Sequence, residues 1–546
     1  MTPANVAARL QAWEDSGFAR RLWAKDHTLW SPTLLPEITD RLGWLDLPTA
    51  MTDQTVASTD LAYALKAAGM RHIVLLGMGG SSLAPEVFQR TCGNAAGYPA
   101  LIVLDSTHPG AVAVVDAAID LRTTTFLVSS KSGTTTETLS LFRYFWRRVA
   151  QRSARPGAHF VAITDPDTPL VRLAHERGFR HVFLAPPDVG GRYSALTVFG
   201  LVPAALIGVD IRGVLDCARH MAEAVGPRVR CRDNPGLRLG AALGEFTLAG
   251  RDKVTLVVPR SLAGLPSWIE QLIAESTGKD GKGIVPVVDE PAGAAGAYGR
   301  DRVFVHVCMT GEATPDLDAS MRALEAAGHP VMRTELADKT DIGQEFFRWE
   351  VAVAAAGAVL GIHPFNQPDV QLAKDLAQQA MQKDGGATPP DPGKTAMPDE
   401  VAVDRRDTLV GTLRAWLATV RPGDYVGVQA YLAPSSATTA ALDAMRQALR
   451  DRLRVATTLG YGPRFLHSTG QLHKGGPNTG LFLQIVDDPP HDLAVPETTY
   501  TFGALIRAQA LGDLAALHRR GRRLVPVNLG RDVAGGLARV AEALRV

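Results

Sequence analysis

Short apolar runs rich in β-branched residues alternate with amphipathic helical segments along most of this chain. Two neighbouring parallel strands need a long crossover connection, which is usually a helix. The alternation therefore predicts an α/β fold in which parallel sheets are doubly wound and flanked by helices. The clearest strand-like runs lie at residues 71–77, 100–105, 124–130, 159–164 and 181–185.

The same alternation restarts near residue 230, and the chain has 546 residues, so we expect more than one α/β unit. A Gly- and Pro-rich stretch later in the chain predicts an exposed linker or loop. The strands beyond it could extend the second sheet rather than fold alone. We expect residues 1–228 to form N-terminal helices and a first unit, 229–383 a second unit, 384–398 the linker or loop, and 399–546 a C-terminal α/β extension packed on the second unit.

The charge balance and the cysteines narrow the class of protein. Lys and Arg number 57 against 56 Asp and Glu, which argues against a nucleic acid or an anionic membrane as partner. Cys92, Cys217, Cys231 and Cys308 are far apart and form no CxxC pair, so zinc and a disulfide framework are not expected. No signal-peptide pattern or long apolar run is present. We expect a cytoplasmic protein without a membrane helix.

The segment 129–138, SSKSGTTTET, contains the strongest candidate binding site. It follows a predicted strand and precedes a predicted helix, and hydroxyls beside a helix N-terminus suit a phosphate group. A polar capping loop is the alternative, because Ser and Thr favour helix N-caps. The density of hydroxyls favours phosphate binding. The candidate ligands are Ser130, Lys131, Ser132, Thr134 and Thr135.

A glycine-rich turn, GMGGSS, follows the first predicted strand. It would place Gly80 and Ser81 at the carboxyl edge of a parallel sheet, where ligands bind. A dinucleotide-binding fingerprint would need a third glycine at the position of Ser82. The alternative is a tight strand–helix connection without a ligand.

Arg192 and Glu275 are candidates for the chemistry itself. Arg192 follows two glycines, so its guanidinium could approach an anion or a developing oxyanion. Glu275 lies near the end of an otherwise apolar helix pattern, where a carboxylate can act as a base, and Gln271 lies one turn earlier on the same side. Each could instead be an ordinary surface residue.

Three further residues have less specific surroundings. Lys374, in FNQPDVQLAK, could supply a proton or balance a negative intermediate, or it could be a solvated helix residue. His467 and His473 lie in a glycine-rich segment that suits a catalytic or lid position, although an exposed loop histidine is the alternative. Their spacing does not match a helical metal pair, and we predict no metal site and no cofactor.

Taken in order, GMGGSS, SSKSGTTTET, GGRYS, QLIAESTGK and FNQPDVQLAK resemble the motifs of the glucose-6-phosphate isomerase family. The chain is most similar to the isomerase half of the fused transaldolase–glucose-6-phosphate isomerases. The resemblance implies two sugar-isomerase (SIS) subdomains. It also implies the reversible conversion of glucose 6-phosphate to fructose 6-phosphate in glycolysis and gluconeogenesis, through a cis-enediol and without a cofactor.

The resemblance also implies roles for the candidate residues. The loop 130–135 would hold the phosphate, and Ser81 would line the sugar site with Gln271. Glu275 would move the proton between C2 and C1, Arg192 would stabilise the intermediate, and Lys374 would assist ring opening.

The chain departs from the family pattern at two places. The last motif has Asn366, Asp369 and Gln371 where Asp, Gly and Glu are common. The ring-opening histidine is replaced by Glu345 in GQEFFRWE, so Glu345 performs this step or a histidine such as His467 or His473 does. In the family this residue often comes from a second subunit, which makes a homodimer an open expectation.

Two other functions remain open at this point. SIS domains also occur in regulators that bind a sugar phosphate without catalysis, although such a sensor needs no base and no charge clamp. A dual phosphoglucose/phosphomannose isomerase would use the same residues. A nucleotide-dependent dehydrogenase is a more distant alternative because of Ser82 in the glycine-rich turn.

Overall fold

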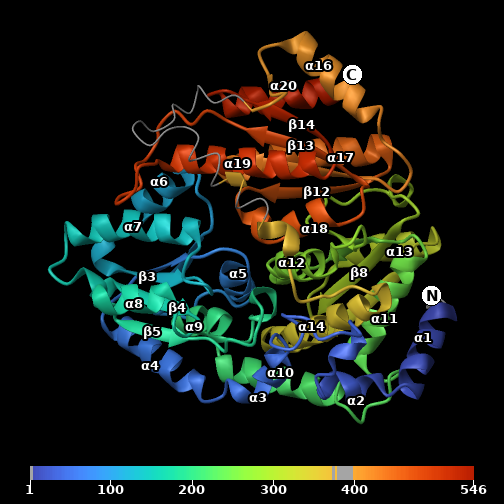
Figure 1. Ribbon diagram of the computed structural model, residues 1–546, viewed down its shortest axis with the longest axis horizontal. Coiled ribbons are helices and arrows are strands. Elements are labelled where there is room, and N and C mark those ends of the chain that lie inside the picture. The colour runs from blue at the N-terminus through green and yellow to red at the C-terminus, as the bar shows by residue number, and fades with distance from the viewer. Residues whose placement is uncertain (1–3, 372–375, 378–396, 546) are drawn as a thin grey trace.

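Three parallel β-sheets flanked by helices make up the protein in the computed structural model, which describes residues 4–371, 376–377 and 397–545 (Figure 1). Every strand pairing within these sheets is parallel. The predicted α/β class is therefore confirmed. Among the described residues, no helix is both long and apolar enough to cross a bilayer.

The first sheet has five strands in the order β2-β1-β3-β4-β5. Its central strands are buried on both faces, as expected for a sheet covered by helices on each side. The strands are β1 (His72–Leu76), β2 (Ala100–Leu104), β3 (Thr124–Ser129), β4 (Phe160–Thr164) and β5 (His181–Leu184), and the accompanying helices are α4 (Gln54–Ala67), α5 (Gly80–Cys92), α6 (Pro109–Ala118), α7 (Thr136–Ala150), α8 (Pro169–Glu176) and α9 (Val198–Leu206).

The second sheet has four strands in the order β7-β6-β8-β9. The strands are β6 (Lys253–Val257), β7 (Val285–Val287), β8 (Arg302–Met309) and β9 (Val331–Leu336), and the helices around them are α10 (Ile211–Ala224), α11 (Pro235–Leu248), α12 (Leu265–Thr277), α13 (Pro315–Ala326) and α14 (Ile342–Leu360). The N-terminal helices α1 (Ala4–Asp15), α2 (Phe18–Trp23) and α3 (Leu47–Ala50) lie beside this unit (Figure 1).

The C-terminal unit has a sheet of its own, with five strands in the order β10-β14-β13-β11-β12. It contacts both other units: His108 pairs with Asp487, and Arg446 donates a hydrogen bond to the carbonyl of Val288. Residues 384–396 of the predicted linker lie outside the described residues. The unit contains β10 (Val401–Ala402), β11 (Tyr425–Tyr431), β12 (Ala456–Tyr461), β13 (Gly480–Val486), β14 (Arg523–Asn528), α16 (Arg406–Leu417), α17 (Ser436–Leu453), α18 (Gly470–Gly475), α19 (Phe502–Arg519) and α20 (Val533–Arg545).

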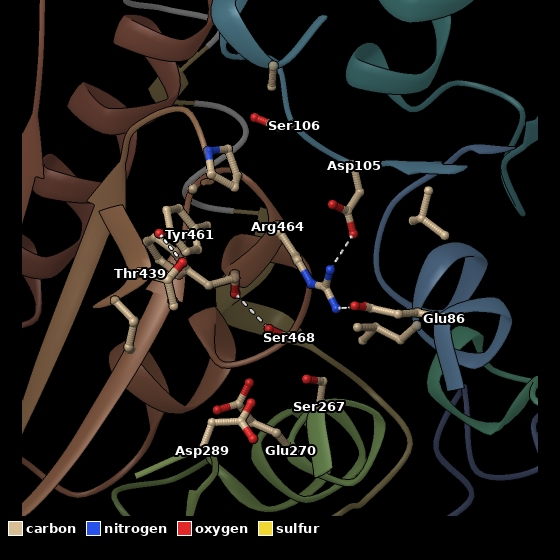
Figure 2. A pocket seen from close by; sticks show the side chains of 18 of the residues that line it. Glu86, Asp105, Ser106, Ser267, Glu270, Asp289, Thr439, Tyr461, Arg464 and Ser468 are labelled. Atoms are coloured by element: carbon tan, nitrogen blue, oxygen red, sulfur yellow. Dashed lines mark hydrogen bonds and ion pairs between the residues drawn. The ribbon is translucent and has the colours of Figure 1, made fainter. Parts of the chain in front are cut away.

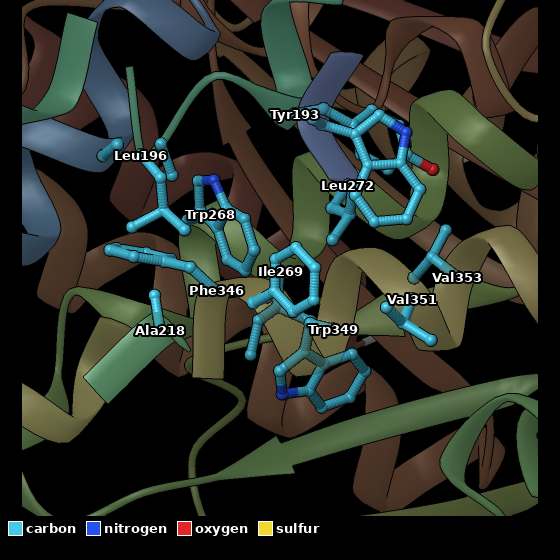
Figure 3. Close-up of a cluster of buried hydrophobic side chains, with 14 of the residues drawn as sticks. Tyr193, Leu196, Ala218, Trp268, Ile269, Leu272, Phe346, Trp349, Val351 and Val353 are labelled. Atoms are coloured by element: carbon cyan, nitrogen blue, oxygen red, sulfur yellow. The ribbon is translucent and has the colours of Figure 1, made fainter. Parts of the chain in front are cut away.

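An aromatic and aliphatic cluster holds α12 in place between the first and second units (Figure 3). Trp268 of α12 is fully buried, and its ring contacts Phe346 of α14 edge-on at a centroid distance of 4.7 Å. Leu272 lies one turn further along α12 and is equally buried. Burying such side chains stabilises the fold by about 1.5–3 kcal/mol each. The helix that bears Glu275 therefore has a fixed position and rotation.

Candidate active site

The glycine-rich turn after β1 brings backbone segments unusually close together. A Cβ on Gly80 would lie 1.9 Å from the carbonyl oxygen of Gly191, so only glycine fits where α5 begins beside the Arg192 segment. Gly79 has a φ of 55° and lies against the backbone of His467. The turn thus joins the first unit to the segments that carry Arg192 and His467.

Glu275 is enclosed by two partners near the C-terminal end of α12. Its Oε2 accepts a hydrogen bond from Gln271 Nε2 at 3.2 Å, and its Oε1 lies 3.6 Å from Arg192 Nη1. Glu275 is 8% exposed and Gln271 is 3% exposed. Gln271 Oε1 is buried and has no hydrogen-bond partner among the described residues. A carboxylate and an unused amide oxygen thus face the same small region.

Arg192 is held in place by the motif near residue 365. Its Nη2 donates to the carbonyls of Pro364 and Asn366 at 2.7 and 3.0 Å, and its Nη1 donates to Gln367 Oε1 at 2.9 Å. Its Nε donates to Ser276 Oγ at 2.8 Å. The guanidinium therefore presents a fixed positive charge beside Glu275.

His467 belongs to the C-terminal unit, in a short 3₁₀ segment named η9 (Arg464–His467). Its carbonyl accepts a hydrogen bond from Gln271 Nε2 at 2.8 Å, and its Nε2 lies 2.9 Å from Glu137 Oε1 in the first turn of α7. Gln509 of α19 donates to the same Glu137 oxygen at 2.8 Å. One continuous chain of contacts thus runs from α7 through His467 to Glu275 and links all three units.

The predicted phosphate loop lies at the carboxyl edge of β3, beside the glycine-rich turn. Ser132 and Thr134 are exposed, and their hydroxyls lie 2.9 Å apart. Ser130 and Thr135 form a second hydroxyl pair at 2.9 Å. Thr135 is the N-cap of α7, yet its side chain does not cap the helix, so backbone N–H groups of the first turn stay available for an anion.

The comparisons with known proteins agree on one family. The family model "Phosphoglucose isomerase" matches residues 51–297, which include the glycine-rich turn, the phosphate loop, Arg192 and Glu275. The chain belongs to this family. The matched span contains the first unit and most of the elements that precede β8.

Relatives of the phosphoglucose isomerase family match a larger part of the chain. The glucose-6-phosphate isomerase of Rubrobacter xylanophilus is 29% identical over 396 residues, which cover 63% of this chain and 90% of the relative. The glucose-6-phosphate isomerase of Parabacteroides distasonis is 28% identical and is covered to 88%.

Two solved structures support the fold. A protein of Thermus thermophilus that is described as hypothetical has a TM-score of 0.59 and 25% identity, and the match covers 68% of this chain and 95% of that protein. A glucose-6-phosphate isomerase of Chlamydia trachomatis has a TM-score of 0.54 and 20% identity, and the match covers 67% of this chain and 78% of that protein.

Glu345 and His473, two of the remaining predicted residues, lie away from Glu275. Glu345 forms a buried ion pair with Arg348 at 2.6 Å, and none of its contacts reaches Arg192, Gln271 or Glu275. His473 is buried in the C-terminal unit, where its Nδ1 contacts Gln429 Nε2 at 3.2 Å. Lys374 lies outside the described residues.

Glu137 is the residue that sequence reasoning missed. It lies within SSKSGTTTET, where an acidic residue in the first turn of a helix reads as a favourable interaction with the helix dipole. Its partner His467 is 330 residues away, so nothing local indicates the pairing. Lys131 was expected to face the phosphate, but its ammonium is paired with Asp165. Among the described residues, no group of three His, Cys, Asp or Glu side chains could hold a metal ion.

Proposed function

We propose that this protein is a glucose-6-phosphate isomerase that converts glucose 6-phosphate to fructose 6-phosphate through a cis-enediol. The relatives that carry this name match along most of their length. The observation that carries the proposal is the placement of the Glu275 carboxylate between Gln271 and the fixed guanidinium of Arg192. A base beside a positive charge is what an aldose–ketose shift requires.

The loop 130–135 holds the phosphate in this proposal. The exposed hydroxyls of Ser132 and Thr134 and the uncapped N-terminus of α7 offer donors to a dianion. The Lys131 ammonium is paired with Asp165, so it adds positive charge near the loop rather than binding the phosphate directly. Phosphate binding at this edge positions the sugar chain toward α12.

Glu275 takes the proton from C2 of the open-chain aldose and returns it to C1. Arg192 stabilises the negative charge that develops on the enediol oxygens. Gln271 Oε1, which has no partner among the described residues, accepts a hydrogen bond from a substrate hydroxyl. Ser81, which is buried beside this region, lines the sugar site together with Gln271.

His467 performs the ring-opening step in this proposal. Its Nε2 lies 2.9 Å from Glu137 Oε1, and this contact fixes the orientation of the imidazole. Glu345 and His473 are engaged elsewhere, which supports the assignment to His467. Lys374 stays a predicted helper in ring opening. Because His467 comes from the same chain, the step does not require a residue from a second subunit, and the homodimer stays a prediction.

Two finer expectations remain with this proposal. Four cysteines that form no disulfide, three of them partly accessible, support a reducing compartment such as the cytoplasm. The similarity to the isomerase half of transaldolase fusions stays a prediction. A regulator that only binds the sugar phosphate would have no use for a glutamate paired with a fixed arginine, which supports catalysis over sensing.

The deciding experiment measures fructose 6-phosphate formed from glucose 6-phosphate by the purified chain with a metal chelator present. We expect turnover, because the proposed acid, base and cation are all side chains of the protein. Mannose 6-phosphate, tested in parallel, separates a strict isomerase from a dual one. If neither sugar phosphate turns over while both bind, the chain is a sensor and the proposal is wrong.

A further inference from the structure

A cavity lies where all three units meet, and Arg464 and Phe465 of η9 are among the residues that line it. Its volume is about 460 Å³. Its walls are formed by α5, the end of β2, α6, the start of α12, the residues that follow β7, α17 and the segment 459–468. This volume is that of a site for a small organic molecule rather than for a bare ion. Arg192, Gln271 and Glu275 are not among the residues that line it, so the cavity is separate from the Glu275 cluster, although both share η9 and α12.

The arginines of this cavity are already engaged. Arg464 pairs with Glu86 and with Asp105, and Arg90 pairs with Glu86 at 2.7 Å. Arg446 pairs with Asp443 and donates to three backbone carbonyls. No guanidinium is left over to attract an anionic ligand.

Two carboxyl groups of the cavity are left without such partners. Glu270 of α12 is only 9% exposed, and among the described residues its carboxyl makes no hydrogen bond and no ion pair. The Asp289 side chain likewise makes no hydrogen bond and no ion pair with the described residues. Figure 2 shows the two carboxyl groups side by side at one end of the cavity, apart from the ion pairs of Arg464.

The surroundings of the two carboxyl groups disfavour their ionised forms. Burial, reinforced by the nearby Asp289, raises the pKa of Glu270 to about 8. Burial also raises the pKa of Asp289. A buried carboxyl that lacks a partner is costly, and a cation with several N–H donors between the two groups would satisfy both.

We propose that this cavity binds a small organic primary amine, with its ammonium group between Glu270 and Asp289. An alkylammonium has three donors and stays charged at neutral pH. The hydroxyl groups of the wall provide further acceptors for a polar or second cationic end of the ligand. These hydroxyls belong to Ser106, Ser267, Thr439, Tyr461 and Ser468.

A metal ion is a poorer occupant of this site. Among the described residues there is no group of three His, Cys, Asp or Glu side chains arranged to hold one. Two carboxylates in a cavity of this size leave most of the coordination shell of a divalent cation unfilled. An organic amine uses the same two carboxylates and fills the remaining volume.

The cavity shares structural elements with the candidate active site. Arg464 and Phe465 line the cavity, and His467 of the same segment contacts Glu137 and Gln271. Glu270 is adjacent in sequence to Gln271 on α12. An amine bound at Glu270 therefore contacts or adjoins η9 and α12, the two elements that position His467 and Glu275. This kinetic consequence, unlike the binding itself, rests on the proposed function.

Calorimetric titration of the full chain with 1,4-diaminobutane tests the proposal, with 1,4-butanediol as a neutral analogue of the same length. We expect the diamine to bind at least about tenfold more tightly than the diol, because only the diamine forms charge-assisted hydrogen bonds. Glu270→Gln should weaken diamine binding at least about tenfold. Glu176→Gln, the same substitution at an exposed position on α8, should leave it unchanged.

Three results would overturn the proposal: equal binding of diamine and diol, undiminished binding to folded Glu270→Gln and Asp289→Asn variants, or an equal loss in Glu176→Gln. The diol comparison uses only the wild-type chain, so it decides the matter even if a variant does not fold.

Proton release gives an independent readout. A bound ammonium should deprotonate Glu270, so below about pH 8 binding should release a proton and tighten as pH rises. The release is measured by titration in buffers of different ionisation enthalpy, and its absence at pH 7 would contradict the proposal. The other charged groups that line the cavity are Glu86 and Arg90 of α5, Asp105, Asp289, Asp443 and Arg446 of α17, and Arg464.

A kinetic arm tests the link to the active site. Saturating diaminobutane should change kcat for fructose 6-phosphate in the wild type and have no such effect in Glu270→Gln. Binding by calorimetry with unchanged kinetics would remove the link and keep the site. If the chain has no isomerase activity, only the proposed function is contradicted. The amine site is still tested, because the calorimetric result does not depend on turnover.

Discussion

Glu270 and Glu275 lie five residues apart on α12, and the structure gives them opposite surroundings. Glu275 contacts Gln271 and the fixed guanidinium of Arg192. Glu270 has neither a hydrogen bond nor an ion pair with the described residues and faces a cavity. Five residues correspond to a rotation of about 140° around a helix, which directs the two side chains to different sides of α12. One well-packed helix thus serves two sites.

The strongest test of this difference is a pair of isosteric variants on the same helix. Glu275→Gln should lower kcat for fructose 6-phosphate by about 10²–10⁴-fold, because an amide cannot accept the proton that moves between C1 and C2. It should still bind diaminobutane. Glu270→Gln should lose diamine binding and keep at least about a tenth of the wild-type kcat. Near-normal turnover in Glu275→Gln would remove this residue from the mechanism.

The next largest effect is expected at the segment shared by the two sites. His467→Ala should lower kcat for glucose 6-phosphate by about 10²-fold, because the proposed ring-opening acid is lost. Glu137→Gln should have a smaller effect in the same direction, since it only orients the imidazole. His518→Ala, at an exposed position on α19, is the control. If His467→Ala matches that control, another residue opens the ring.

Substrate affinity should depend on the loop at the other end of the site. The double variant Ser132→Ala/Thr134→Ala should raise KM about tenfold and change kcat less, because phosphate contacts bind substrate and transition state alike. Inorganic phosphate should inhibit the wild type, and it should inhibit the double variant much less. Ser436→Ala, an exposed serine at the start of α17, serves as the control. An unchanged KM would count against phosphate binding at this loop.

The smallest effect concerns a third buried carboxyl, that of Glu350, which has no hydrogen-bond partner among the described residues. Glu350 of α14 is fully buried, both of its oxygens lack hydrogen-bond partners among the described residues, and burial raises its pKa well above the usual value. The folded chain therefore keeps a proton that the unfolded chain releases above about pH 4.5. Its free energy of unfolding should fall as pH rises.

Glu350→Gln removes this titration. The stability of the variant relative to the wild type should increase between pH 6 and pH 8, by up to about 1.4 kcal/mol per pH unit, as measured by urea denaturation. Glu176→Gln should show no such trend. A stability difference that is independent of pH would mean that Glu350 is ionised in the folded chain.

Local sequence patterns predicted the architecture well. The predicted run at residues 124–130 became β3 (Thr124–Ser129), and the run at 159–164 became β4 (Phe160–Thr164). A strand that is buried on both faces leaves a short continuous apolar run, and a helix that is buried on one face leaves a periodicity of about 3.6 residues. Both patterns depend only on near neighbours. The order of motifs also led to the correct family.

The sequence by itself determined the alternation of strands and helices, the hydroxyl-rich loop, and the presence of Arg192, Gln271 and Glu275, since each depends on residues a few positions apart. Only the tertiary structure decided that His467 rather than Glu345 reaches the Glu275 cluster and that the His467 ring contacts Glu137. It also decided that Glu270 has no partner within the described part of the chain. These outcomes depend on how three sheets pack together. No periodicity within a segment encodes which distant side chain will fill the space beside it.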